Sequence, residues 1–200
     1  MKSGLFSLAQ SLTSGMHTYI SILRGINVSG QKKINMNDLK AVYESLSFKN
    51  VKTYIQSGNV LFQTKKIAER TIAHKIEQAI KKHYDFDVPV IVLALDELNH
   101  AIDNNPFRKE KSINMDRVYI TFLAEEAAKE NVDKTNTLDF SPDRFVISGR
   151  EIYIHCPISY GNSKINNNFF ENKLKVTATT RNWKTVNELK RLAETMISAV

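Results

Sequence analysis

The order of apolar segments between residues 17 and 94 constrains the fold of this 200-residue chain more than any other feature. Residues with alternating or continuous apolar character predict strands, and apolar residues at helical spacing predict helices. The turn Ser57-Gly58-Asn59 tolerates positive φ and predicts a hairpin. The expected elements are a strand at 17–23, a helix at 36–46, strands at 51–56 and 60–64, a helix at 68–80 and a strand at 88–94. This β-α-β-β-α-β order is the ferredoxin-like pattern.

The second half of the chain repeats the same order in weaker form. The expected elements are a strand at 117–123, a helical segment at 124–131, a hairpin of strands at 144–148 and 151–156, a helix at 164–175 and a strand at 176–180. The hairpin sequence IQSGNVLF at 55–62 aligns with VISGREIYI at 146–154. We therefore predict an α+β fold made by duplication of two ferredoxin-like halves, with an extra C-terminal helix from about Asn182.

The predicted organisation has four parts. Residues 1–15 are interpreted as a disordered tail, an upstream start or a remnant of an expression vector, because the patterned sequence begins at Met16. Residues 16–94 form the first half, 95–115 a connector whose helix stops before Pro106, and 116–200 the second half with the C-terminal helix.

Charge and cysteine content narrow the environment and the partners. The formal net charge of +7 favours nucleic acid or phosphorylated molecules as ligands. The lysines near 65–82, however, alternate with acidic residues, and this pattern is more typical of a solvated helix face. The single cysteine, Cys156, excludes an intramolecular disulfide and fits a reducing compartment, so we expect a cytoplasmic protein. The chain has no run of eighteen apolar residues, which excludes a transmembrane helix and predicts no membrane partner.

The loop that follows the first strand is the main candidate for anion binding. Gly25 and Gly30 lie between a strand and a helix, as glycines do in a phosphate-binding loop. Gln31 and Lys32 stand where such a loop needs lysine and a hydroxyl, so an NTPase is rejected. Exposed amides and the lysines at 32–33 could still favour an anion. The alternative is that both glycines only shape a turn.

Polar residues in the second half extend this candidate site. Arg181 could present its guanidinium to a phosphate or carboxylate, Asn182 is a natural helix N-cap, and Lys164 lies in a polar loop before a helix. The histidines lack the spacing of a metal site, so no metal and no cofactor are predicted. Cys156 is expected to be a buried core residue rather than a nucleophile.

Four motifs together resemble the bacterial family catalogued as domain of unknown function 1697. They are LRGINVSGQKKINMNDL at 23–39, VKTYIQSGNVLF at 51–62, NPF at 105–107 and TTRNWKTVNEL at 179–189. Ser29 and Lys184 depart from the expected Gly and Asn. The resemblance implies an α+β fold of two ferredoxin-like halves, and it implies no activity.

The favoured hypothesis is a non-enzymatic binding module for an anionic, phosphate-bearing ligand, either a small molecule or nucleic acid. The alternatives are a metal-independent enzyme acting on a small anionic substrate and a protein-interaction module. No nucleophile-and-base pair can be named, and the oligomeric state stays open. The predicted ligand-binding residues are Arg24, Gly25, Asn27, Gly30, Lys32, Ser57, Asn59, Lys164, Arg181 and Asn182.

Overall fold

The protein, seen here in a computed structural model, divides into two compact units. The structure describes residues 15–28 and 30–198. The first unit runs to Leu95 and includes the end of the chain from Leu189, and the second unit is Asp96–Glu188. The predictions for the segment 1–15 therefore lie, except at Gly15, outside the described residues.

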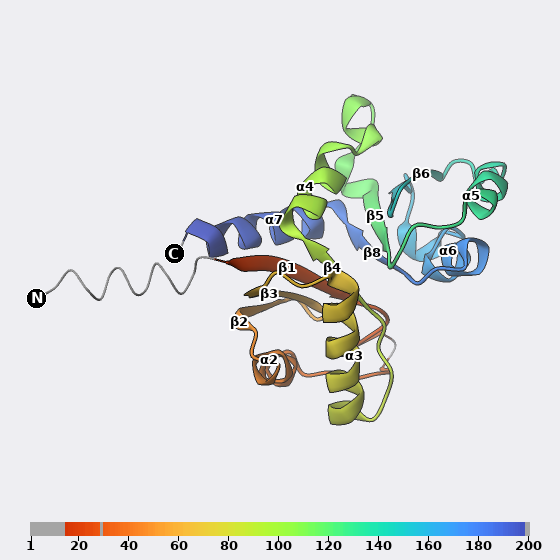
Figure 1. Ribbon diagram of the computed structural model, residues 1–200. Helices are drawn as coiled ribbons and strands as arrows, with labels where there is room; N and C mark the ends of the chain where they lie inside the picture. Colours follow the sequence, from red (N-terminus) through yellow and green to blue (C-terminus); the bar gives the residue numbers. More distant parts are fainter. Residues whose placement is uncertain (1–14, 29, 199–200) are drawn as a thin grey trace, which may run out of the picture. The chain divides into compact units, whose positions relative to one another are not determined.

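The first unit contains a four-stranded antiparallel sheet in the order β2-β3-β1-β4 (Figure 1). Its elements are β1 (Met16–Leu23), α2 (Met36–Ser45), β2 (Lys49–Tyr54), β3 (Asn59–Lys65), α3 (Glu69–Tyr84) and β4 (Val90–Ala94). The central strand β1 pairs with β3 on one side and with β4 on the other. This arrangement confirms the β-α-β-β-α-β order predicted for the first half.

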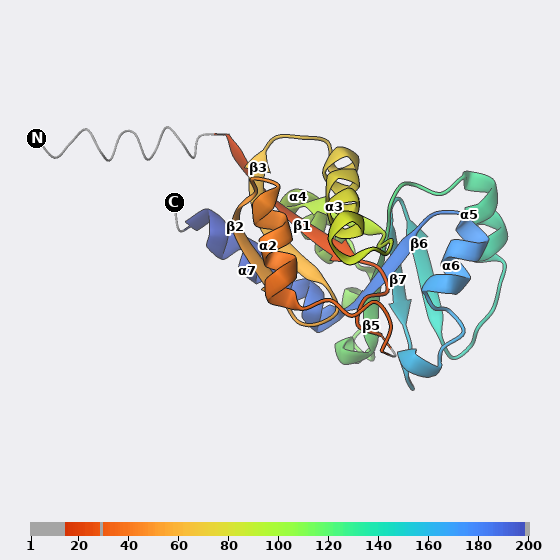
Figure 2. The same cartoon turned by 90° about the horizontal axis from the view of Figure 1, so that it is seen from below.

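Helices α2 and α3 lie side by side over one face of this sheet, as the view from below shows (Figure 2). Helix α2 is capped by Asn35, whose side-chain oxygen accepts from the amides of Asn37 and Asp38 and so satisfies donors of the first turn. The apolar faces of both helices pack on the strands in one buried cluster, which includes Leu39, Tyr43, Ile72, Ile76, Ile80, Tyr19, Phe62 and Val92. The apolar residues of α2 and α3 that recur at helical spacing in the sequence are therefore buried against the sheet, as predicted.

The end of helix α7 (Trp183–Ser198) belongs to the first unit from Leu189 onward. Its residues Leu189, Ala193 and Met196 are buried. The carbonyl of Met196 accepts a 3.3 Å hydrogen bond from the side chain of Gln63 on β3. The last turns of α7 therefore join this sheet as part of its fold.

The second unit repeats the topology with a sheet in the order β6-β7-β5-β8. Its elements are α4 (Leu95–Asp103), η1 (Pro106–Lys109), η2 (Met115–Arg117), β5 (Val118–Leu123), α5 (Lys129–Asn136), β6 (Arg144–Ser148), β7 (Glu151–His155), η3 (Tyr160–Asn162), α6 (Asn167–Leu174), β8 (Ala178–Asn182) and the start of α7. Helices α5 and α6 contact each other, and residues of α6, β5, β7 and β8 share one buried cluster. The two sheets with their helices make an α+β fold of two repeated halves, as predicted.

Helix α5 begins five residues later than the helical segment expected at 124–131. The amide of Ala124 donates a 2.9 Å hydrogen bond to the carbonyl of Thr177, which continues the pairing of β5 beyond its last residue. The helix starts only where the carbonyl of Ala128 accepts from the amides of Asn131 and Val132. Tertiary strand pairing here overrides the helix propensity of an Ala- and Glu-rich segment.

Candidate functional site

Three loops meet at one end of the first sheet and bring several predicted ligand-binding residues together. The amide of Leu23 donates to the carbonyl of Gly58 at 2.8 Å, which ties the end of β1 to the β2–β3 turn. The amide of Arg24 donates to the carbonyl of Pro89 at 2.9 Å, which ties it to the α3–β4 loop. Arg24, Gly25 and Ser57 therefore lie within one loop cluster.

Asn27 holds this loop cluster together. Its side-chain oxygen accepts from the amide of Ile34 at 2.9 Å, and its side-chain nitrogen donates to the carbonyls of Ile34 and Gln56 at 3.0 and 2.9 Å. Its φ of 54° lies in the left-handed region, which asparagine tolerates better than most residues. These contacts give Asn27 an architectural role, and its predicted ligand-binding role stays a prediction.

The hairpin turn uses its polar residues in the same way. Asn59 is fully buried, and its side-chain nitrogen donates to the carbonyl of Tyr54 at 3.0 Å and to the hydroxyl of Ser57 at 3.1 Å. These bonds close the turn and satisfy the buried amide. Asn59 thus presents its amide to the turn itself.

Lys32 points toward the end of helix α3. Its ammonium donates a 2.7 Å hydrogen bond to the carbonyl of Asp87, while the ammonium of Lys81 lies 2.7 Å from an Asp87 carboxylate oxygen. The hydrogen bond to Asp87 raises the pKa of Lys81. Two of the cations at this end of the loop cluster are therefore held by one aspartate residue.

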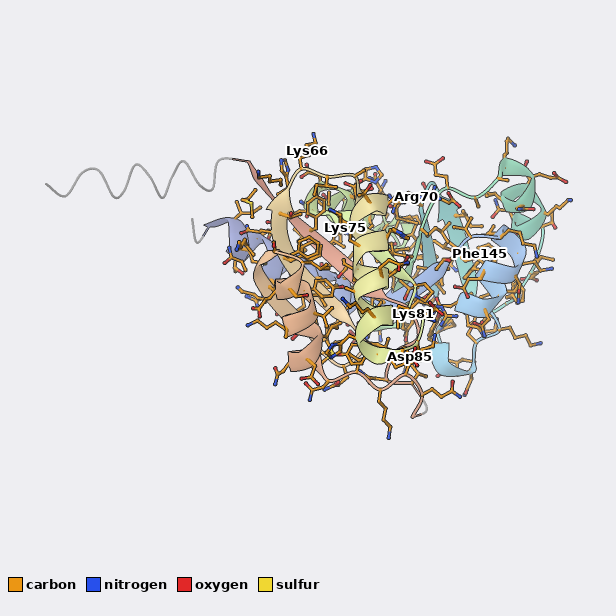
Figure 3. All side chains as sticks on the ribbon, turned by 60° about the horizontal axis from the view of Figure 1, so that its bottom comes forward. Lys66, Arg70, Lys75, Lys81, Asp85 and Phe145 are labelled. Carbon is orange, nitrogen blue, oxygen red and sulfur yellow. The ribbon has the colours of Figure 1, made fainter. Side chains whose placement is uncertain are left out.

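Helix α3 carries a basic surface on the side away from the sheet. We call this surface the basic face; it consists of Lys65 and Lys66 just before the helix and of Arg70, Lys75, Lys81 and Lys82 on it, all exposed. Figure 3 shows Arg70, Lys75 and Lys81 along the helix and Lys66 in the segment that precedes it. Both acidic residues of the helix, Glu69 and Glu77, are only partly exposed.

The acidic residues of this segment therefore balance the lysines less than the sequence suggests. A side-chain oxygen of Glu77 accepts from the amide of Val90 at 2.9 Å, which turns this carboxylate toward strand β4. Asp85 and Asp87 lie beyond the last residue of the helix, at Tyr84. The structure describes the whole of α3, and within this helix the basic face has no exposed acidic residue.

The predicted residues of the second unit lie in local structure of their own. Arg181 is 8% exposed, and its guanidinium donates to the Thr179 hydroxyl at 3.1 Å and to the Thr180 carbonyl at 2.8 Å. The side-chain oxygen of Asn182 accepts from the amide of Thr185 at 2.7 Å, which confirms it as the cap of α7. Lys164 lines a cavity of about 420 Å³ beside Asp139, Asp143 and Asn162.

Cys156 and His155 are adjacent at the end of β7, and the thiol of Cys156 does not resemble a reactive group. Cys156 is fully buried, which confirms the core position, and burial raises the pKa of its thiol to about 11. Burial and the nearby Arg144 lower the pKa of His155. A thiol that stays protonated at neutral pH is a poor nucleophile. Within residues 15–28 and 30–198, no group of three or more His, Cys, Asp or Glu side chains is placed to hold a metal ion.

Sequence reasoning missed an acidic pocket in the second unit. A cavity of about 430 Å³ is lined by Asp96, Glu97, His100, Glu126, Ser148, Gly149, Arg150 and Glu151. Glu151 was the available signal: it alternates with Tyr153 along β7, so it shares a strand face with a buried aromatic residue. A charged residue at such a position is rarely placed there by packing alone.

The fold and these surfaces define an α+β protein with two repeated halves, whose first half carries the basic face. Residues 16–153 match the family described as "Protein of unknown function (DUF1697)", and the chain belongs to this family. Its structure is also similar to that of the conserved bacterial protein SP0830 from Streptococcus pneumoniae, with a TM-score of 0.72 and 23% identity over 90% of this chain and 99% of that chain. At this identity the likeness supports the fold alone. No curated protein matches the chain.

None of the helices in the described part of the chain is both long and apolar enough to cross a membrane.

Proposed function

We propose that this protein is a non-enzymatic module that binds a phosphate-bearing ligand, and that this ligand is a nucleic acid strand lying along the basic face. The observation that carries the proposal is the composition of the exposed side of α3, where lysine and arginine occur without an exposed carboxylate. Phosphate charge supplies most of the affinity of sequence-independent nucleic acid binding, and lysine and arginine are the side chains that neutralise it.

The length of the basic face suits a polyanion better than a single phosphate. Helix α3 has 16 residues, which corresponds to about 24 Å at about 1.5 Å per residue. Successive phosphates of one duplex strand advance by about 3.4 Å along the axis. Several phosphates can therefore lie within reach of the basic face at once.

The two ends of the helix differ in their suitability for anions. At the N-terminal end Ala68 provides no side-chain cap, so the helix dipole adds to the charge of Lys65, Lys66 and Arg70, while the carboxylate of Glu69 in the first turn offsets part of that charge. At the other end, Asp87 takes up Lys81 and the dipole disfavours anions. We expect the strongest phosphate contacts near Lys66, Arg70 and Lys75.

The predicted loop residues then form the second part of the proposed surface. Lys33 is exposed beside Lys32, and the loop around Gly25 and Gly30 is tied to the α3–β4 loop through Lys32. We further propose that Lys164, Arg181 and Asn182 of the second unit contact the phosphate-bearing ligand. A reduced, buried Cys156 fits action in the cytoplasm, which we propose as the location.

A titration with labelled nucleic acid tests this function. The double variant Lys66→Glu/Lys75→Glu should weaken binding of a short single-stranded RNA or DNA by about tenfold or more, because it reverses two charges on the basic face. Fluorescence anisotropy with single- and double-stranded oligonucleotides measures the change.

The matched control is Lys111→Glu/Lys173→Glu, which changes the net charge equally with two exposed lysines of the second unit. It should retain most of the affinity. Equal losses in the two double variants would show that only net charge matters and would reject the basic face as the site.

A further inference from the structure

The acidic pocket of the second unit is a built site that the proposed nucleic acid binding does not use. Its walls come from helix α4 (Asp96, Glu97, His100), from the loop after β5 (Glu126) and from the β6–β7 hairpin (Ser148 to Glu151). Its volume of about 430 Å³ lies in the range of pockets for small molecules, which is roughly 300–1,000 Å³. A water molecule or a bare ion needs far less space than this.

Glu151 is the unusual residue of this pocket. It is only 9% exposed, yet its carboxylate has no hydrogen-bond partner among the described residues. Buried carboxylates are normally paired or hydrogen-bonded, since removing them from water without compensation is costly. An unpaired buried carboxylate that lines a cavity is therefore ready to receive a donor from a bound molecule.

A second carboxylate shares the space beside Glu151. A Cβ atom placed on Gly149 would lie 3.7 Å from Oε2 of Glu151 and 3.8 Å from Oε1 of Glu126. Both carboxylate oxygens thus border the same small volume next to Gly149. Two like charges so placed attract a cation more strongly than either does alone.

The pocket's own guanidinium is engaged elsewhere. Nη1 of Arg150 donates to Oε1 of Glu97 at 2.8 Å, and its Nε donates to the carbonyl of Leu123 at 3.2 Å. Four carboxylates therefore face one guanidinium and one imidazole, and the guanidinium is bound to one of the four. The remaining charge is negative.

We propose that this pocket binds a small organic cation that carries N–H donors, an alkylammonium or alkylguanidinium. The donors hydrogen-bond to the carboxylates of Glu151 and Glu126, and such charge-assisted bonds are stronger than neutral ones. The side chains of the described residues form no group suited to a metal ion, which favours an organic cation over a divalent metal. The space beside the carboxylates accommodates the carbon chain.

The protonation of Glu151 agrees with this assignment. Burial raises the pKa of Glu151, with further contributions from the carboxylates of Glu97 and Glu126, while His100 and Arg150 lower it. A raised pKa in the folded state means that the stabilising contribution of the group is present at low pH and is lost as the pH rises through that pKa. Above that pKa the ionised Glu151 therefore costs stability in the free protein, and a bound cation offsets this cost.

Calorimetric titration of the full chain at neutral pH tests the proposal with 1,4-diaminobutane and butylguanidinium as probes. At least one probe should bind saturably at millimolar concentration or below, and Glu151→Gln should weaken that binding by about tenfold or more. The matched control is Glu130→Gln, an exposed residue of α5 that pairs with Lys134 outside the pocket. It should leave the affinity unchanged.

A second readout separates a binding role from a structural one. If Glu151 is held for a ligand, Glu151→Gln should raise the melting temperature of the ligand-free protein at neutral pH and abolish the additional stabilisation by the probe. Tetramethylammonium, which lacks N–H donors, and neutral butan-1-ol should bind at least tenfold more weakly. Equal binding by tetramethylammonium, tighter binding of Mg²⁺ than of both probes, or unchanged probe affinity in Glu151→Gln would overturn the proposal.

Discussion

At Gly58 the chain has room for a hydrogen atom and nothing larger. A Cβ atom there would lie 2.7 Å from Cδ1 of Ile26 and 2.8 Å from Cβ of Leu23, and the φ of 79° is in the left-handed region. The sequence identified Gly58 as a turn residue by its type. It could not show that the turn packs against Ile26, because this contact joins segments about thirty residues apart in the chain.

We expect Gly58→Ala to destabilise the first unit by about 2–4 kcal/mol, the sum of left-handed strain and overpacking. Gly25→Ala is the control, since Gly25 has a φ of 71° but no atom within 4 Å of its Cβ position. It should cost only about 1–2 kcal/mol. Urea denaturation measures both, and equal costs would show that the contact with Ile26 contributes nothing.

At the scale of the elements, the apolar periodicity predicted every strand and helix of the first half. Alternation and helical spacing depend on local sequence, so they survive in the folded chain. The sequence does not predict the exact end of an element where long-range pairing determines it. Helix α5, for example, begins at Lys129 because Ala124 pairs with Thr177. The orientation of Glu77 toward the amide of Val90 is a tertiary contact of the same kind.

In the candidate site, too, local features could be predicted from the sequence and long-range contacts could not. The caps at Asn35 and Asn182 were predictable, because a short polar side chain before a helix has a local role. The hydrogen bonds of Asn27 within the loop cluster and the burial of Glu151 without a hydrogen-bond partner among the described residues could not be predicted, since both depend on neighbours distant in sequence.

Helix α3 should depend on its apolar stripe for stability and on its basic face for binding. Ile76→Ala removes a fully buried side chain and should destabilise the first unit by about 2–5 kcal/mol. The exposed control on the same helix, Gln78→Ala, should change stability by less than about 0.5 kcal/mol. Hydrogen exchange of the amides in α3 and β4 reports the effect, and unchanged protection in Ile76→Ala would contradict the packing described here.

At the scale of the whole molecule, one topology occurs twice with different surfaces. The first unit places lysine and arginine along its second helix, and the second unit places carboxylates around its β6–β7 hairpin. Repeated element order was visible in the sequence because it needs only local patterns. The sequence did not show that opposite charges gather in two distinct sites, since the formal net charge of +7 averages over both units.

The salt dependence of nucleic acid binding measures how many phosphates the basic face neutralises. The logarithm of the binding constant should fall linearly with the logarithm of the salt concentration, with a slope of about −0.7 to −0.9 for each phosphate neutralised. Replacing Lys66 and Lys75 by glutamate should reduce the magnitude of this slope by about 1.4 to 1.8, because two phosphate contacts are lost. A slope near zero in the unmodified protein, or the same slope in the double variant, would contradict binding along the basic face.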